Sequence, residues 1–290
     1  MARSDQTKSA ALTLIIALIV MITSVAAHAA SYTFSGSGGT YSGTDYAPPA
    51  GDVRSAKAVF DNSGGELDLT LTNTATWTAE SPTDILTAIV FNFACDPTLT
   101  AVSANITTGS TIVGDLPNPD TDPGSTGVGG EWALAPTTDT PNLATNAYGA
   151  SDGVSSTGLN LFGAANFPGA NLQGPSSSVD GPQYGIAPAG GVDPNGSAVK
   201  SGGGAAFIQN AVIFDLGGYT GTLDSSVISN ITFIYGTGIG EAQIGTTRTL
   251  PVPEPPFVQT AVLLLLGGLY AFRLRRGRKQ FPPQGGLALA

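Results

Sequence analysis

Residues 66–73, ELDLTLTN, alternate between leucines and polar side chains. Successive side chains of a β-strand point to opposite faces, so the three leucines share one face and the polar residues share the other. This pattern predicts a strand with one buried and one solvated face. The run at 84–94, DILTAIVFNFA, is apolar on both faces, which is typical of a central strand that is covered on both sides.

The strand pattern recurs along the chain. Segments 206–216 and 227–235 predict two more strands, and the Gly-rich connection 217–221 leads us to expect them as antiparallel neighbours. Shorter candidates are 32–34, 56–60, 99–106 and 112–113. Many short strands separated by Gly/Pro turns must bury one face against another sheet. The expected fold is therefore all-β, an antiparallel β-sandwich spanning residues 30–244 with long Gly/Pro-rich loops.

Residues 114–203 are rich in Gly and Pro and contain turn-forming stretches such as DLPNPDTDPG and VDPNG. Apolar side chains, among them Trp132 and Tyr184, are nevertheless spread through this segment. A structureless loop of this length is uncommon inside a compact domain. We therefore expect short strands and ordered loops that pack on the sandwich.

The composition restricts the function. Only 11% of the 290 residues are charged and the formal net charge is −10, whereas a typical soluble domain is about 25% charged. Between residues 30 and 252 there are nineteen acidic and four basic residues, a formal charge of −15. Such a surface repels phosphate backbones, so nucleic-acid binding is not expected.

The N-terminus has the features of a secretory signal. Arg3 and Lys8 precede an uncharged apolar run at 10–22, and Ala27 and Ala29 place small residues where signal peptidase reads its substrate. We expect a signal peptide of residues 1–29, cut after Ala29. The alternative is an uncleaved membrane anchor.

The C-terminus predicts a single membrane span. The segment 245–255 is a Pro-rich linker that ends in Pro253-Glu254-Pro255, and an uncharged run follows at 256–272. Seventeen helical residues span roughly 25 Å, slightly less than the ~30 Å hydrocarbon core, and long basic side chains can reach the headgroups. The positive-inside rule places the tail 273–290 in the cytoplasm. Its basic cluster comprises Arg273, Arg275, Arg276, Arg278 and Lys279.

This tripartite C-terminus resembles the PEP-CTERM sorting signal of bacterial exosortase substrates. The matching parts are VPEP at 252–255, the Leu- and Gly-rich span and the cluster RLRRGRK. The resemblance implies that an integral-membrane exosortase cuts near Pro-Glu-Pro and releases or transfers the ectodomain to the cell surface or its exopolysaccharide layer. The chain departs from the pattern at 280–290, QFPPQGGLALA, where such signals usually stop. The alternative is an ordinary C-terminal anchor with a Pro-rich stalk.

A second resemblance covers roughly residues 66–240. The segments GGEWAL, LNLFG, NFPGANLQGP, DGPQYGI and NAVIFDL look like stretches of a group of exosortase-anchored ectodomains. This resemblance implies one family domain and assigns no activity to it.

The mature chain offers little catalytic chemistry. Cleavage after Ala29 removes His28, the single histidine, and with it His-based catalysis and imidazole metal ligation. We expect Cys95, the single cysteine, to be a small buried side chain. Carboxylates near tryptophans, Glu131 beside Trp132 and Glu80 near Trp77, suggest a glycoside hydrolase. Adjacent residues of a strand face opposite sides, however, which favours a solvated Glu131 beside a core Trp132.

Calcium is the one cofactor that the sequence suggests. Asp115, Asp120 and Asp122 lie within eight residues of a Pro/Gly-rich loop, and Ca²⁺ binds such carboxylate and carbonyl oxygens. Their spacing does not match an EF-hand loop. The alternative is that these aspartates begin turns.

These observations favour a protein that is not an enzyme. We expect an exported structural or interaction protein, processed by signal peptidase and exosortase, held first in the inner membrane and then placed at the cell surface or extracellular matrix with its exopolysaccharide. The alternative is a glycan-binding surface module, with or without calcium, suggested by the Trp, Tyr and Asn content of the loops. A carboxylate-based glycoside hydrolase is less favoured.

Overall fold

In a computed structural model of the chain, the alternating segment at 66–73 forms strand β3 (Leu67–Asn73), and its three leucines are fully buried. β3 lies inside a six-stranded sheet, sheet A, in which every neighbouring pair of strands is antiparallel. The order across sheet A is β15 (Thr247–Arg248), β1 (Ser31–Ser37), β2 (Ser55–Asp61), β3, β12 (Ala211–Gly217) and β5 (Thr100–Ile106). Buried and half-buried residues alternate along β2 and β3, so sheet A has one apolar and one polar face.

The structure describes a defined part of the chain. The described residues are 31–38, 52–62, 64–114, 126–135, 148–157, 170–172, 181–196, 205–223, 226–238 and 241–248. Within them the regular structure is strands and two short 3-10 turns, η1 (Pro82–Asp84) and η2 (Gly129–Glu131), so the expected all-β class is confirmed. No helix in these ranges is long and apolar enough to cross a membrane.

The second sheet, sheet B, is built around β4 (Leu86–Phe93), the apolar run of the sequence. One edge of β4 pairs with β13 (Ile228–Tyr235), which pairs in turn with β14 (Gln243–Gly245). The opposite edge of β4 pairs with β8 (Asp152–Ser155) and β10 (Ile186–Ala187). The remaining strands are β7 (Ala133–Ala135) and β9 (Ala170–Asn171) beyond β8, and β11 (Ala206–Gln209) and β6 (Thr111–Gly114) beyond β10.

The expectation of a purely antiparallel fold is wrong at one pair of strands. β10 and β11 run parallel, with Ile186 opposite Ile208. Parallel neighbours need a long connection, and the chain between Ala187 and Ala206 supplies one. The other strand pairs described are antiparallel.

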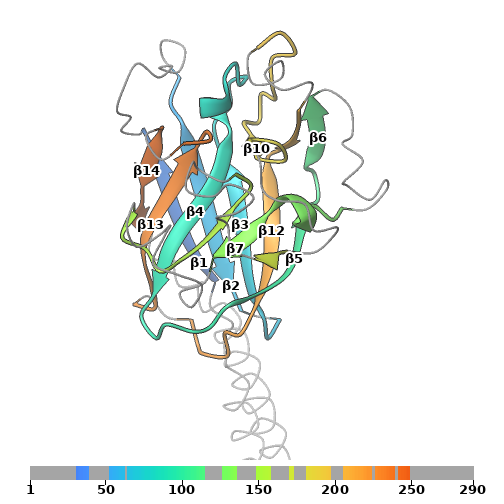
Figure 1. Cartoon of the computed structure of the whole chain (residues 1–290). Coiled ribbons are helices and arrows are strands. Elements are labelled where there is room, and N and C mark those ends of the chain that lie inside the picture. The colour runs from blue at the N-terminus through green and yellow to red at the C-terminus, as the bar shows by residue number, and fades with distance from the viewer. Residues whose placement is uncertain are drawn as a thin grey trace, which may run out of the picture. The chain divides into compact units, whose positions relative to one another are not determined.

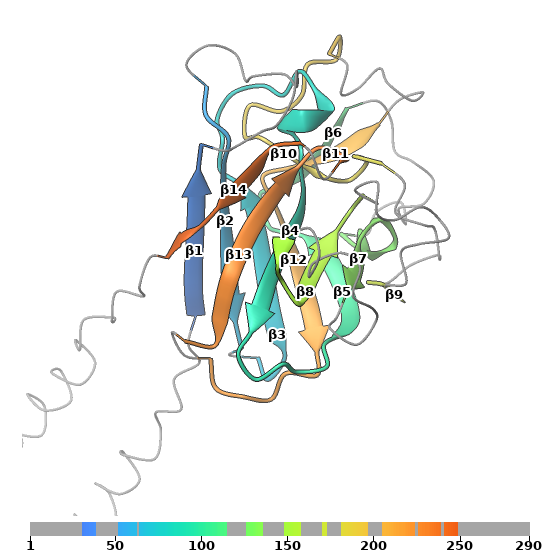
Figure 2. The same ribbon diagram turned by 60° about the vertical axis from the view of Figure 1, so that its left-hand side comes forward.

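The two sheets face each other across one apolar core (Figure 1, Figure 2). Phe60 of sheet A lies 5.1 Å from Phe91 and 6.4 Å from Phe93 of sheet B between ring centroids, both in edge-to-face geometry. Trp132 lies 4.9 Å from Phe214 of β12. Each buried aromatic side chain of this kind contributes about 1.5–3 kcal/mol to stability. The outer face of β4 is also covered, because Ala88 and Val90 pack with residues outside the main core, and so β4 is buried on both sides as predicted.

Segment 206–216 is not one strand, and it is not the neighbour of 227–235. The chain leaves sheet B after β11, turns at Asn210 (φ 85°) and enters sheet A as β12. β12 pairs with β3 and β5, whereas β13 pairs with β4 and β14. The connection after Gly217 therefore crosses from one sheet to the other instead of forming a hairpin. Period-two alternation cannot show this, because it is the same in both sheets.

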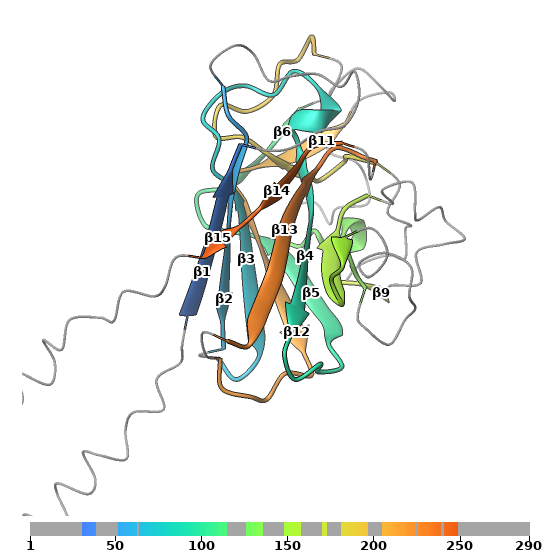
Figure 3. The same cartoon turned by 90° about the vertical axis from the view of Figure 1, so that its left-hand side faces the viewer.

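The chain changes sheets again at its last strands. β14 belongs to sheet B and β15 to sheet A, where Arg248 pairs with Phe34 of β1 (Figure 3). Gly36 of β1 permits this crossing, since a Cβ there would lie 2.6 Å from Cγ2 of Ile244. The strands thus continue to Arg248, and the first residues of the expected linker 245–255 belong to the folded domain.

Several predictions from the sequence fall partly or wholly outside the described residues. Residues 114–203 are ordered as short strands and turns where they are described, at β7, β8, β9 and β10, as expected. The signal peptide 1–29, the span 256–272 and the tail 273–290 lie outside the described ranges.

Candidate functional site

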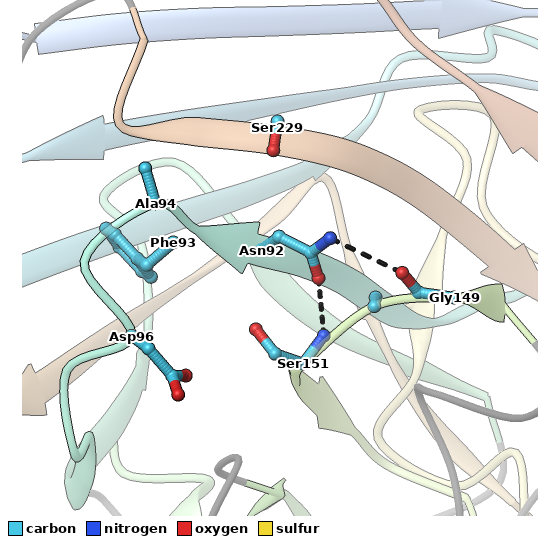
Figure 4. A pocket seen from close by; sticks show the side chains of 8 residues that line it. Asn92, Phe93, Ala94, Asp96, Gly149, Ser151 and Ser229 are labelled. Carbon is cyan, nitrogen blue, oxygen red and sulfur yellow. Dashed lines mark hydrogen bonds between the residues drawn. The ribbon is translucent and has the colours of Figure 1, made fainter.

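An open depression lies at one end of β4 in sheet B, with a volume of about 430 Å³ (Figure 4). Small-molecule sites commonly occupy about 300–1,000 Å³. It is lined by the end of β4 and the turn after it, the segment before β8, and β13: Asn92, Phe93, Ala94, Asp96, Gly149, Ala150, Ser151 and Ser229. Three segments that are distant in sequence therefore meet around one surface.

Asn92 holds two of these segments together. Phe91 and Phe93 point into the core, where their ring centroids lie 5.7 Å apart. Asn92 lies between them in the sequence and therefore points to the opposite face of β4. Its Nδ2 donates to the Gly149 carbonyl at 3.3 Å, and its Oδ1 accepts from the Ser151 amide at 2.5 Å (Figure 4). The amide side chain thus fixes the backbone before β8 against β4.

The backbone around the depression adopts left-handed conformations at three places. Asp96 has φ 45°, Gly149 has φ 66° and Asn230, next to Ser229, has φ 51°. Asp and Asn tolerate this region better than other residues with a Cβ, but at a cost of roughly 1–2 kcal/mol. Asn230 Nδ2 also donates to the carbonyls of Tyr148 and Gly149. Such conformations persist where the surrounding structure fixes them, and they cluster at binding sites.

The depression offers hydrogen-bonding groups and little charge. Asp96 and Ser229 are exposed, and Asp96 is the only carboxylate among the lining residues. Ser151 Oγ donates to the buried Asp152 carboxylate at 2.7 Å. A glycoside hydrolase needs two carboxyl groups that flank the bond to be broken. The described lining supplies one, so this surface is suited to binding and not to that reaction.

Glu131 does not lie where the sequence suggested. It belongs to the 3-10 turn η2 and is 4% exposed, so the expectation of a solvated carboxylate is wrong. In this turn the Glu131 side chain is directed into the interior, and the alternation rule applies to strands and does not predict it. Trp132 is fully buried as expected, and its Nε1 donates to the Tyr184 carbonyl at 3.0 Å. Trp132 therefore belongs to the core and presents no ring to a ligand.

The second tryptophan pair is closer to the surface. Glu80 is exposed, and Trp77 is partly exposed with its Nε1 donating to the Val53 carbonyl at 3.2 Å. The backbone amide of Glu80 donates to the Asp84 carboxylate at 3.1 Å. These contacts tie the segment to its neighbours.

Cys95 is exposed, which corrects the expectation of a buried side chain. β4 ends at Phe93, and the Asp96 amide donates to the Phe93 carbonyl at 3.2 Å, closing a tight turn. Cys95 lies in that turn and points away from the core. It is adjacent in sequence to Ala94 and Asp96, which line the depression.

A buried ion pair lies at the entry to β2 and β4. Arg54 Nη2 and Asp84 Oδ1 are 2.8 Å apart, with side chains 1% and 3% exposed. Arg54 Nε also donates to the Thr83 carbonyl at 2.9 Å, and the Ser81 amide donates to Asp84 at 3.0 Å. Burial raises the pKa of Asp84, while Arg54 and the backbone amides act against that rise.

Tyr235, the last residue of β13, is fully buried. Its hydroxyl has no hydrogen-bond partner among the described residues, and burial raises its pKa. This tyrosine and the Arg54–Asp84 pair belong to the interior.

Carboxylates form a row across the outer face of sheet A. Asp61, Asp68 and Asp215 stand opposite one another on β2, β3 and β12, and Ser103 of β5 continues the row and donates to Asp215. Burial, a hydrogen bond with Asp215 and the neighbouring charges raise the pKa of Asp68 to about 6. Within the described ranges, no three His, Cys, Asp or Glu side chains are grouped so as to hold a metal ion.

The predicted calcium ligands and the terminal motifs are not part of the described structure. Asp115, Asp120 and Asp122 lie between β6 and the next described residue. Ala27 and Ala29, the Pro253-Glu254-Pro255 motif and the basic cluster at 273–279 also lie outside the described ranges.

No family model, no curated protein and no solved structure matches this chain.

The residues that form the depression were not identified from the sequence. One signal was present: Asn92 is the single amide within the apolar run AIVFNFA, where a polar side chain requires a partner. Nothing in the sequence pairs it with Gly149 and Ser151, because that contact depends on how the 148–157 segment folds back on β4.

Proposed function

We propose that this chain is an exported bacterial surface protein that is delivered through a PEP-CTERM-type signal and has a structural or interaction role in the exopolysaccharide envelope, without catalysis. Signal peptidase removes residues 1–29. The run 256–272 spans the inner membrane as a helix until an exosortase cuts near Pro253-Glu254-Pro255. The acidic β-sandwich between these signals is the part that remains outside.

One observation supports this proposal most strongly. β1 begins at Ser31, directly after the expected cut behind Ala29, and β15 ends at Arg248, a few residues before Pro253. β1 and β15 pair with each other, so the folded domain closes between the two processing signals. Cleavage at both sites would leave every described strand intact.

The sorting proposal is tested in a host that has an exosortase. The triple variant Pro253→Ala/Glu254→Ala/Pro255→Ala should keep the unprocessed C-terminal mass and stay in the inner-membrane fraction. The matched control, Pro282→Ala/Pro283→Ala in the tail, should be processed like the unaltered chain. Mass spectrometry of the mature protein and cell fractionation give the result. Unchanged processing and delivery of the triple variant would refute the sorting proposal.

The N-terminal part of the proposal has its own test. The mature protein should begin at Ala30, and Ala27→Arg/Ala29→Arg should block the cut because signal peptidase requires small residues there. Sequencing of the mature N-terminus reads this directly, and a chain that retains Met1 would establish the uncleaved anchor.

A second candidate role for the exposed domain is glycan binding. The observation that favours it is the open, hydrogen-bonding depression around Asn92. Calcium dependence at Asp115, Asp120 and Asp122 is a separate proposal, and comparing binding with and without a chelator tests it. The single carboxylate in the described lining of the depression speaks against the glycoside hydrolase alternative.

A further inference from the structure

We propose that the depression formed by Asn92, Asp96, Ser151 and Ser229 binds a neutral sugar unit of a polysaccharide chain. This inference rests on the proposed role of the domain as a surface interaction module and names the site and the ligand class. The hydrogen-bonding groups, the charge and the apolar side chains around the depression each restrict the chemical class of the ligand.

The hydrogen-bonding groups suit a polyol. The exposed Asp96 carboxylate has about four acceptor positions and can accept from a ligand hydroxyl group in addition to its protein contacts, and the exposed Ser229 hydroxyl can donate and accept. Gly149 and Ser151 occupy two of the four hydrogen-bonding positions of the Asn92 amide, which leaves two to offer to a ligand. A sugar ring carries donors and acceptors around its whole edge, so groups on different sides of the depression can be used together.

The charge argues against an anionic ligand. Among the described lining residues Asp96 is the one acidic side chain, and none of them is a lysine or an arginine. The domain around it is acidic, with a formal charge of −15 between residues 30 and 252. An anionic sugar, a phosphate or a nucleic acid would be repelled by this field.

The apolar groups argue against a hydrophobic peptide. Among the described residues the large exposed hydrophobic side chains are Val53, Val102 and Ile112, and none of them lines the depression. The apolar lining residues are Phe93, Ala94 and Ala150, of which Phe93 and Ala150 are buried and Ala94 is exposed. Such a surface can contact the C–H face of a sugar ring but provides no pocket for a large anchor side chain.

The depression is held in shape without a ligand. Asn92 bridges Gly149 and Ser151, and Asn230 donates to the same Gly149 carbonyl from β13. A rigid site loses little conformational entropy on binding, which matters for a ligand that gains only a few hydrogen bonds. The depression is open to solvent, so the neighbouring sugar units of a polymer can continue beyond it on either side.

The test uses the full chain purified in detergent and two sets of immobilised oligosaccharides. The neutral set contains glucose, mannose, galactose and N-acetylglucosamine oligomers, and the acidic set contains uronate and sulfated oligomers. We expect binding to at least one neutral oligomer and none to the acidic set. A fluorophore on Cys95, the single and exposed cysteine beside Asp96, gives a second readout in solution.

Two variants test the site itself. Asp96→Asn keeps a residue that tolerates positive φ and removes the charge, and it should weaken binding about 10–100-fold, the value of a hydrogen bond to a charged group. Ser229→Ala should weaken it about 2–10-fold. The matched controls are Glu66→Gln and Ser31→Ala, exposed residues on or beside sheet A, and they should bind like the unaltered chain.

Each other outcome overturns the proposal. Failure to bind any neutral oligomer, binding to the acidic set alone, or binding that Asp96→Asn and Ser229→Ala leave unchanged would each refute it. Loss of binding with a chelator would assign recognition to a metal site elsewhere. Delivery of the protein is measured separately in cells, so failure of the glycan site and failure of the sorting proposal are distinguishable.

Discussion

Asp68 and Asp215 stand directly opposite each other on β3 and β12, and their carboxyl groups share a hydrogen bond when one of them is protonated. Asp61 stands opposite Asp68 on its other side, and Glu66 is close by. Like charges directly opposite each other in a sheet are destabilising. Here one carboxyl group keeps its proton to a higher pH, which turns the repulsion into a shared hydrogen bond at mildly acidic pH.

We therefore expect the domain to be more stable at pH 5 than at pH 7. The pKa of Asp68 is about 6 in the folded chain and about 3.9 in an unfolded one. The folded state thus binds more protons between these values, and the free energy of unfolding falls as the pH rises from about 4 to 6. The shift corresponds to about 2.9 kcal/mol without screening, and solvent around this half-buried group reduces it to about 1 kcal/mol.

The variant Asp68→Asn isolates this effect. Urea unfolding followed by tryptophan fluorescence should show that the variant loses about 0.5 kcal/mol of the difference between pH 5 and pH 7, since about half of the effect falls between these pH values, while gaining stability at pH 7. The control Asp52→Asn removes a carboxylate at the other end of β2 and should retain the full difference. An equal pH dependence in the unaltered chain and in Asp68→Asn would contradict the prediction.

The buried pair Arg54–Asp84 predicts a larger effect. Arg54→Met leaves the Asp84 carboxylate in the interior without its cation, which should cost about 3–5 kcal/mol in the free energy of unfolding. The pKa of Asp84, already raised by burial, should rise further. The variant should therefore lose stability as the pH rises above the pKa of the unfolded residue, about 3.9.

Two comparisons separate the ion pair from a general loss of charge. Lys57→Met removes a half-buried lysine of β2 and should change the free energy of unfolding by less than about 0.5 kcal/mol. The double variant Arg54→Met/Asp84→Asn should cost less than the sum of the single changes, because neither residue is then left as an unpaired charge. Additive costs would show that the two side chains act independently.

The sequence predicted individual strands well, because each depends on local alternation. Leu67, Leu69 and Leu71 face the core as the pattern required, and the apolar run became the central strand β4. It did not predict which strands are neighbours. That depends on Asn210, where the chain leaves sheet B for sheet A, and on Gly36, which lets β14 pass close to β1. Both are tertiary features with weak local signals.

The candidate site was less predictable than the fold. Its parts come from the ends of β4, the segment before β8 and β13, and they meet only through long-range hydrogen bonds of Asn92 and Asn230. Trp132 is fully buried, as the sequence predicted, whereas its neighbour Glu131 is buried against expectation. Burial of an aromatic residue depends on the opposing sheet, here Phe214, which is distant in the sequence.

The position of Cys95 gives a direct test of the turn beside the depression. In the folded full chain a maleimide should modify Cys95 completely without denaturant, because the thiol is exposed. In the control Cys95→Ser/Ala104→Cys the thiol lies at a fully buried position of β5 and should react only on unfolding. Mass spectrometry measures both. Modification of Cys95 that requires denaturant would mean that the turn after β4 is built differently.

The left-handed backbone at Asn210 should make the crossing between the two sheets sensitive to substitution at this position. Its φ of 85° is unfavourable for a β-branched residue, and its Nδ2 donates to the Gly109 carbonyl at 3.1 Å. Asn210→Val should cost about 2–3 kcal/mol, from about 1–2 for the backbone and about 1 for the hydrogen bond. Asn210→Gly loses only the hydrogen bond and should cost about 1 kcal/mol or less.

The matched control is Asn62→Val, since Asn62 Nδ2 donates to the Gly221 carbonyl at 2.8 Å and its φ is not positive. The loss of unfolding free energy in Asn62→Val should be similar to that in Asn210→Gly. Equal free energies of unfolding for Asn210→Val and Asn210→Gly would show that the crossing does not depend on this backbone conformation.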